Sequence, residues 1–242
     1  GLIHMGEVIV DKPFTKNQMN KSSWRTMGPI TDLQALMMSS NVYMFNIMDR
    51  MIGPEHWTQT YAKARYSFNQ YGLGVKTGID FPNEAIGYEG KPPEGESGTL
   101  YDLGIGQFDT YTTMQLVQYV STIANDGYRV KPHLVREIRE PATDDKSHGK
   151  LLKRFEPEIL NKIDVEQKYI ERVQDGFWQV MHGSKGTAKG YFDDPAKYHN
   201  PAGKTGTAQR IIRHPRTGNI VEKHNLTLVG YAPFENPEIA FA

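Results

Sequence analysis

Cysteine is absent from the 242 residues, which excludes a disulfide framework and thiolate metal sites. Net charge is absent too, because 28 basic residues balance 28 acidic ones. Bulk electrostatics therefore favours neither nucleic acid nor an anionic membrane surface as a partner. No run approaches the ~20 apolar residues that a membrane helix needs, so no spanning helix is predicted within these residues.

Motifs for metals, nucleotides and nucleic acids are also missing. The eight histidines are scattered and include no H-E-x-x-H pair. No G-x-G-x-x-G follows a strand pattern, and no basic stripe carries interleaved aromatic residues. The sequence therefore predicts no metal, no cofactor and no nucleic-acid partner. Its hydrophobic content of 38% is enough for a globular core.

The first clear elements are two consecutive helices. Thr31 and Gln34 have the spacing of a capping box and predict a short helix that ends near Ser39. Apolar residues over 42–51 predict a second, deeply buried helix, which Gly53-Pro54 ends. Ser39 and Asn41 are thus expected at a helix–helix junction.

Beyond the junction, helices precede strands. Residues 71–103 predict an irregular surface loop, 113–124 a helix, 128–130 a strand and 140–150 a charged excursion. A further helix is predicted from a cap at Asp164 to Gly183, followed by an antiparallel hairpin of 202–212 and 220–232. This order favours an α/β protein of the α+β type, with an antiparallel sheet packed against helices. A last strand at 238–242 has no turn after it, so the chain is expected to be incomplete there.

The run Lys204-Thr205-Gly206-Thr207 begins the first strand of that hairpin, and each residue type has a chemical use there. Lysine supplies a cation, and the two threonines supply hydroxyls for a carboxylate. Gly206 lets a substrate backbone approach closely, and a main-chain N–H beyond it can face an oxyanion. The same three letters recur at Lys76-Thr77-Gly78, but in a glycine-rich loop, which predicts a solvated loop lysine.

Ser39-Ser40-Asn41 places a hydroxyl and an amide at the helix junction. Together these groups can donate and accept hydrogen bonds toward a substrate amide and a lysine. Ordinary helix capping is the alternative, because serine and asparagine are both preferred caps.

These motifs resemble the S-x-N and K-T-G elements of penicillin-binding proteins and serine β-lactamases. Further stretches resemble class B, monofunctional penicillin-binding proteins of Gram-positive bacteria, in the same order along the chain. They are 36–44 (LMMSSNVYM), 71–80 (YGLGVKTGID), 104–109 (GIGQFD), 114–127 and 229–233 (VGYAP). The resemblance covers most of the chain from about residue 30 onward.

The resemblance implies the penicillin-binding fold and a D,D-transpeptidase that cross-links peptidoglycan stem peptides and is acylated by β-lactams. By motif match, Ser39 relays a proton to the leaving amine, Asn41 holds the substrate amide, and Lys204 positions charge near Ser39. Thr205 and Thr207 bind the terminal carboxylate, and the Thr207 N–H forms half of the oxyanion hole. Implied partners are stem peptides, β-lactams and other cell-wall synthesis proteins, at the outer face of the cell membrane.

One family element is missing. The nucleophilic S-x-x-K should precede S-x-N, and no match lies there. Ser147-His148-Gly149-Lys150 fits the letters, but it follows S-x-N and lies in the charged excursion, so it is rejected as the nucleophile. Residues 1–242 are therefore interpreted as a partial transpeptidase domain, incomplete at both ends, whose membrane anchor and nucleophile lie outside them. A β-lactamase, a D,D-carboxypeptidase and a non-catalytic β-lactam sensor remain alternatives.

Overall fold

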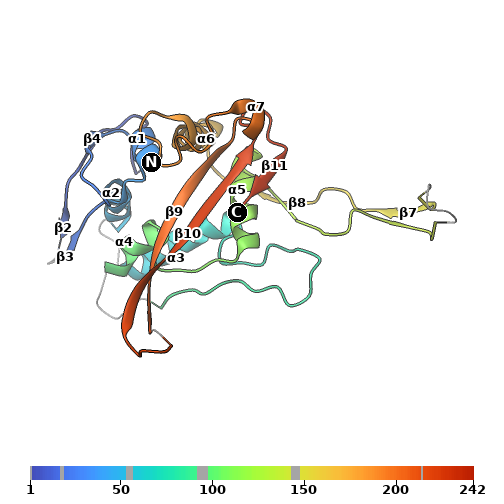
Figure 1. The fold of residues 1–242 in the computed structure, drawn as a ribbon, viewed down its shortest axis with the longest axis horizontal. Helices are drawn as coiled ribbons and strands as arrows, with labels where there is room; N and C mark the ends of the chain where they lie inside the picture. Colours follow the sequence, from blue (N-terminus) through green and yellow to red (C-terminus); the bar gives the residue numbers. More distant parts are fainter. Residues whose placement is uncertain (1, 17–18, 53–56, 92–97, 143–147, 214) are drawn as a thin grey trace.

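The structure is a computed structural model that describes residues 2–16, 19–52, 57–91, 98–142, 148–213 and 215–242. A long antiparallel hairpin of two strands, β9 and β10, runs through it (Figure 1). The helices are α1 (Asp32–Met38), α2 (Asn41–Ile52), α3 (Trp57–Gln70), α4 (Gly98–Gly104), α5 (Thr113–Ala124), α6 (Gln167–His182) and α7 (Pro195–Tyr198). The strands are β1 (Ile9–Asp11), β2 (Phe14–Lys16), β3 (Met19–Lys21), β4 (Gly28–Ile30), β5 (Tyr128–Val130), β6 (Glu137–Arg139), β7 (Leu151–Arg154), β8 (Ile159–Lys162), β9 (Ala202–Arg213), β10 (Ile220–Ala232) and β11 (Ile239–Phe241).

The predicted helix junction is confirmed. Thr31 caps α1, and Gln34 completes the capping box from both directions. Ser39 ends α1 in the left-handed conformation, with φ 57°. Only Ser40 lies between Ser39 and the first residue of α2. The reversal at Ser39 thus changes the chain direction within two residues.

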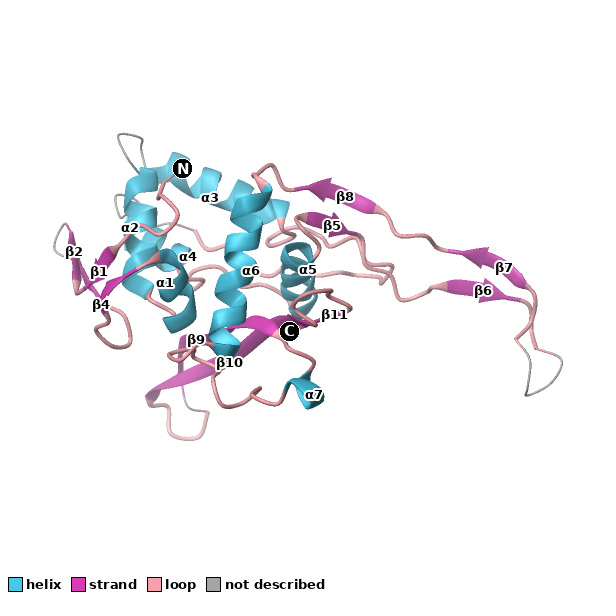
Figure 2. Cartoon of the chain, turned by 90° about the horizontal axis from the view of Figure 1, so that it is seen from above, coloured by secondary structure: helices cyan, strands magenta, loops and turns pink. Residues whose placement is uncertain are grey.

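The predicted hairpin is also confirmed. Strands β9 and β10 pair antiparallel from Ala202↔Tyr231 to Arg213↔Ile220, and the sheet order is β11-β10-β9. Among the described residues, no strand pairs with the other edge of β9, which is called its free edge below. Helices α5 and α6 pack on this sheet, as Figure 2 shows, and share a core with it. That core contains Val120, Ile123, Phe177, Ala202, Val229 and Tyr231. Helices packed against an antiparallel sheet confirm the α+β interpretation.

Two helices in the first half differ from expectation. The expectation of irregular chain up to residue 103 is wrong at its end, because α4 buries Leu100, Tyr101 and Leu103 almost completely. Glycines at both ends of α4 hide this short helix in the sequence pattern. Helix α3 was not predicted, because its fully buried residues are Thr60, Tyr61 and Ala64, and its apolar Trp57 and Phe68 are only partly buried. Such a face gives a weak apolar stripe.

Helix α6 begins at Gln167 and not after Asp164, which corrects the predicted start. Ile163 is still extended and donates its N–H to Gly127, next to the β5–β8 pair, at 2.9 Å. This pairing keeps the chain from turning helical at Asp164. The predicted end at Gly183 is confirmed, since the N–H of Gly183 bonds to Gln179.

Strands β6 and β7 form a two-stranded arm that extends away from the rest of the chain (Figures 1 and 2). Of the predicted charged excursion, the described residues 140–142 follow β6 and 148–150 precede β7. Lys150 of the rejected S-x-x-K match is exposed there. Ser147, its serine, lies outside the described residues.

Candidate active site

Ser39 and Lys204 are 165 residues apart in sequence and in contact in the structure. The Nζ atom of Lys204 on β9 donates to the Oγ atom of Ser39 at 2.8 Å. The same nitrogen donates to the carbonyl oxygen of Thr205 at 2.8 Å. The serine of the S-x-N motif and the lysine of the K-T-G motif are therefore in direct hydrogen-bond contact.

Burial governs the charge of Lys204. Desolvation lowers the pKa of this lysine from 10.5 to about 8. A lysine in this condition is still mostly protonated at neutral pH, but it releases its proton far more readily than a surface lysine. It combines a usable cation with an accessible free-amine form, which suits proton handling.

A buried carboxylate stabilises the junction of α1 and α2 through hydrogen bonds. Asp11 is 2% exposed, and its Oδ2 atom accepts hydrogen bonds from the hydroxyls of Ser23 (2.7 Å) and Ser40. Those two hydroxyls in turn accept from the N–H groups of Val42 (3.1 Å) and Tyr43 (3.0 Å) in the first turn of α2. The three side chains thus cap α2 and place a negative charge at its positive end.

Replacing Asp11 with alanine is expected to lower the free energy of unfolding by about 2 kcal/mol, because the buried hydroxyl of Ser40 and the half-buried hydroxyl of Ser23 lose their acceptor. Asp11→Asn should cost about 1 kcal/mol, since the amide oxygen still accepts one bond. Urea denaturation measures both values. Asp193→Ala removes an exposed carboxylate and should stay within about 0.5 kcal/mol. Equal effects at positions 11 and 193 would contradict the supporting role of Asp11.

Asn41 is the first residue of α2 and is partly exposed, so its amide has access to the space beside Ser39. Ser40, the middle residue of the motif, is 2% exposed and faces the Asp11 network. Ser39 and Asn41 are therefore partly exposed, whereas Ser40 is buried in the network that caps α2.

Consecutive residues of β9 point to opposite faces. Lys204 reaches Ser39, whereas the Thr205 hydroxyl lies 2.6 Å from that of Thr187. Thr207 shares the face of Thr205 and is exposed. A Cβ added at Gly206 would have only Thr227 within reach, its nearest atom at 3.5 Å, so packing does not require glycine at that position.

Gln107 contacts the free edge of β9. Its amide nitrogen donates to the carbonyl of Gln209 at 2.8 Å, and its amide oxygen accepts from the Gln209 N–H at 3.4 Å. Because backbone groups alternate along a strand, the N–H of Thr207 turns to the same edge as that of Gln209. The Thr207 N–H therefore lies on the edge of β9 where a further extended segment could form backbone hydrogen bonds.

The other Lys-Thr-Gly copy is built into a loop. Thr77 is fully buried, and the carboxylate of Glu84 accepts hydrogen bonds from its N–H (2.6 Å) and its hydroxyl. Glu84 also accepts from the N–H of Gly78 at 3.3 Å. Lys76 itself is exposed, which confirms the predicted solvated loop lysine.

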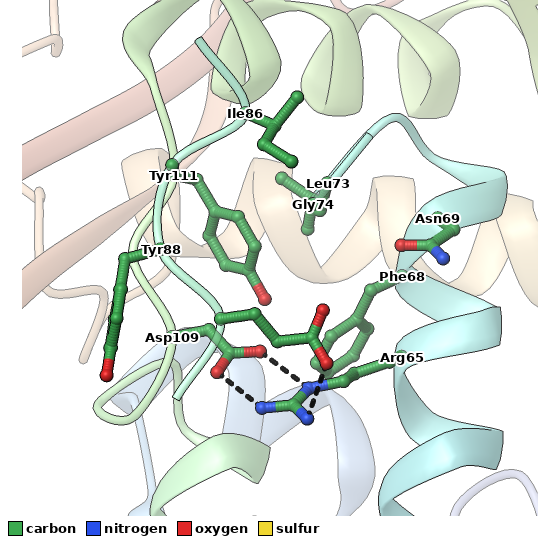
Figure 3. A pocket seen from close by; sticks show the side chains of 11 residues that line it. Arg65, Phe68, Asn69, Leu73, Gly74, Ile86, Tyr88, Asp109 and Tyr111 are labelled. Atoms are coloured by element: carbon green, nitrogen blue, oxygen red, sulfur yellow. Dashed lines mark hydrogen bonds and ion pairs between the residues drawn. The ribbon is translucent and has the colours of Figure 1, made fainter. Parts of the chain in front are cut away.

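A small pocket lies on another part of the chain, between α3 and the loops at 86–89 and 109–111 (Figure 3). The Arg65 guanidinium binds Asp109 at 2.8 Å and the carbonyl of Gly90 at 2.6 Å there. No predicted site residue lines this pocket in the described chain. The Arg65–Asp109 ion pair joins α3 to the loop between α4 and α5.

Three residues of the site region were missed from sequence: Asp11, Gln107 and Thr187. Their residue types are ordinary in loops and strand ends, and no local pattern marks them. Gln107 lies in a stretch that carried the family resemblance, which is the one signal that pointed toward it.

The fold and this meeting of S-x-N with K-T-G are those expected of a penicillin-binding transpeptidase domain. The family model described as "Penicillin binding protein transpeptidase domain" matches residues 1–242, and the chain belongs to that family. Its relatives narrow the assignment to class B penicillin-binding proteins of the Gram-positive type, as predicted. Penicillin-binding protein 2A of Bacillus subtilis is 44% identical over all of this chain and 34% of its own length. Penicillin-binding protein 2B of Streptococcus pneumoniae strain D39 is 36% identical over 91% of this chain and 33% of its own length.

Solved structures agree with this assignment. Penicillin-binding protein 2B from Streptococcus pneumoniae strain R6 has a TM-score of 0.84 and 33% identity, covering 99% of this chain and 40% of that one. Penicillin-binding protein 3 of Mycobacterium tuberculosis, in complex with aztreonam, has a TM-score of 0.67 and 26% identity over 96% of this chain and 49% of that one. The chain spans about a third of the length of its curated relatives. No helix in the described ranges is long and apolar enough to cross a membrane.

Proposed function

We propose that this chain contributes the S-x-N and K-T-G elements to the active site of a D,D-transpeptidase that cross-links peptidoglycan stem peptides through a serine acyl-enzyme. The observation that carries the proposal is the 2.8 Å hydrogen bond from Lys204 Nζ to Ser39 Oγ. It joins two motifs that lie 165 residues apart and that no local sequence pattern relates. Stem peptides and β-lactams are the proposed ligands, and other cell-wall synthesis proteins are the proposed partners.

The proposed reaction begins with a serine of an S-x-x-K segment outside these 242 residues. Its oxygen attacks the carbonyl carbon of the penultimate D-alanine, and its proton passes to the lysine of that segment. The peptide C–N bond then breaks as Ser39 gives its proton to the leaving amine and takes up the proton held by that lysine, so that the lysine returns to its free-amine form. Lys204 holds the Ser39 oxygen in place, and Asn41 binds the substrate amide.

The strand residues are proposed to hold the rest of the donor. Thr205 and Thr207 share one face of β9, which suits two hydroxyls that bind one carboxylate. The Thr207 N–H turns to the free strand edge, where it can donate to the developing oxyanion. The open space at Gly206 supports close approach of a substrate backbone, because packing leaves that glycine otherwise unexplained.

Acylation of the complete protein by a labelled penicillin tests the proposal. We expect one stable adduct by intact-mass spectrometry and slow turnover of a chromogenic cephalosporin. Rapid hydrolysis of the cephalosporin would instead favour a β-lactamase. A stable adduct without release of D-alanine or cross-linking of a stem peptide would favour a sensor, and release without cross-linking a carboxypeptidase.

The isolated 242 residues, interpreted as a partial transpeptidase domain, are proposed to be inactive without the S-x-x-K serine. Labelled penicillin should leave their mass unchanged. Acylation at Ser147 would overturn the rejection of that serine. We further propose that the complete protein is anchored in the cell membrane and acts on its outer face.

A further inference from the structure

Thr187 connects the two sides of the proposed site. It lies in the loop between α6 and α7, and its backbone N–H donates to the carbonyl of Met37 at 3.2 Å. Met37 is two residues before Ser39, in the last turn of α1. The Thr187 hydroxyl lies 2.6 Å from the Thr205 hydroxyl on β9. One residue therefore touches both the S-x-N junction and the K-T-G strand.

The loop that carries Thr187 is held closely against α6. A Cβ added at Gly186 would lie 2.4 Å from the carbonyl oxygen of Val180, and one at Gly183 would lie 2.5 Å from the sulfur of Met37. On the other side, the N–H of Ala188 donates to Val180 at 3.0 Å, and Ala188 is 3% exposed. With both neighbours fixed, the backbone of Thr187 is held where its hydroxyl meets that of Thr205.

The direction of the hydroxyl–hydroxyl bond follows from proton counting. A threonine hydroxyl has one proton to donate and lone pairs that accept. When Thr205 donates its proton to a carboxylate, the bond to Thr187 persists only if Thr187 is the donor. In such a chain each hydrogen bond polarises the next, which strengthens the Thr205 donor. A hydrocarbon at position 187 leaves the Thr205 hydroxyl free to rotate.

We propose that Thr187 is a positioning residue for the donor carboxylate and acts through Thr205. This inference rests on the proposed function, in which Thr205 binds that carboxylate. It assigns to the loop after α6 a part in substrate recognition, although Thr187 itself need not touch the substrate. The specific consequence is that Thr187 matters only for ligands that carry the carboxylate.

The test measures the second-order rate constant for acylation of the complete protein by benzylpenicillin and by its methyl ester, which lacks the negative charge. Thr187→Val keeps the shape and removes the hydroxyl, and should slow acylation by benzylpenicillin about tenfold. Acylation by the ester should change less than twofold. Thr187→Ser restores a hydroxyl and should recover most of the rate, and it serves as the second variant if valine impairs folding.

Two controls separate positioning from general stability. Thr122→Val removes a buried hydroxyl that bonds to the Gln118 carbonyl at 2.7 Å in α5, and it should leave both rate constants unchanged. In a Thr205→Val background, Thr187→Val should add less than a twofold loss, because its effect passes through Thr205. Additive effects, or equal losses with acid and ester, would overturn the inference alone. A wild-type protein that is not acylated by penicillin would overturn the proposed function and this inference with it.

Discussion

Lys204→Ala is expected to slow acylation of the complete protein by a penicillin by a factor on the order of 10² to 10³. An oriented, desolvated donor at a reacting centre is typically worth about 3 to 4 kcal/mol. The substitution removes the hydrogen bond from Lys204 to Ser39 and the positive charge on the residue that precedes Thr205, one of the threonines proposed to bind the carboxylate. Stopped-flow measurement of acylation at saturating and subsaturating penicillin separates the effect on binding from that on the chemical step.

The chain offers a matched control for this experiment. Lys76→Ala changes the same residue type in the same three-letter motif, but the Thr77 beside it is buried in a loop with Glu84. Its acylation rate should stay within twofold of wild type. Unchanged kinetics in Lys204→Ala, or a large loss in Lys76→Ala, would mean that the wrong copy of the motif was assigned to the site.

The parts of the site that local sequence patterns encode were predictable. A capping box at Thr31 and Gln34 predicts where α1 starts, and a short chain reversal follows from Ser39 onward. Alternation along β9 predicts which hydroxyls share a face. The 2.8 Å contact of Lys204 with Ser39 was expected only from the family resemblance, because nothing local relates residues 165 positions apart.

The supporting residues were not predictable, for a physical reason. Asp11 reads as an exposed aspartate near a lysine and a proline, yet three chain segments bury it against two serine hydroxyls. Thr187 reads as a loop residue, and its role depends on where β9 passes. Their functions arise from tertiary contacts, which override the surface preference of polar residues. The missed helix α3 shows the same effect, since its buried face is only weakly apolar.

The low pKa of Lys204 predicts how acylation depends on pH. Burial places this pKa at about 8, so the charged fraction falls from roughly nine-tenths at pH 7 to about one-hundredth at pH 10. Acylation by benzylpenicillin should therefore decline above pH 8, by about tenfold per pH unit. The methyl ester, which has no carboxylate to attract, should lack this limb of the profile. A decline that begins only near pH 10.5 would contradict the buried, perturbed lysine.

The free energy of unfolding should rise with pH over the range in which the acylation rate falls. The folded-state pKa of about 8 lies below the ordinary value of 10.5, so between pH 8 and 10.5 the unfolded chain binds more protons than the folded one. Folding stability contributed by this group thus rises with pH across that window, by about 3 kcal/mol in total. Lys204→Met cannot titrate and serves as the reference, so the difference in unfolding free energy between the two proteins isolates the lysine. If that difference stays flat from pH 8 to 10.5, the amine is solvated in the folded protein, and the same charge cannot carry the pH dependence of acylation.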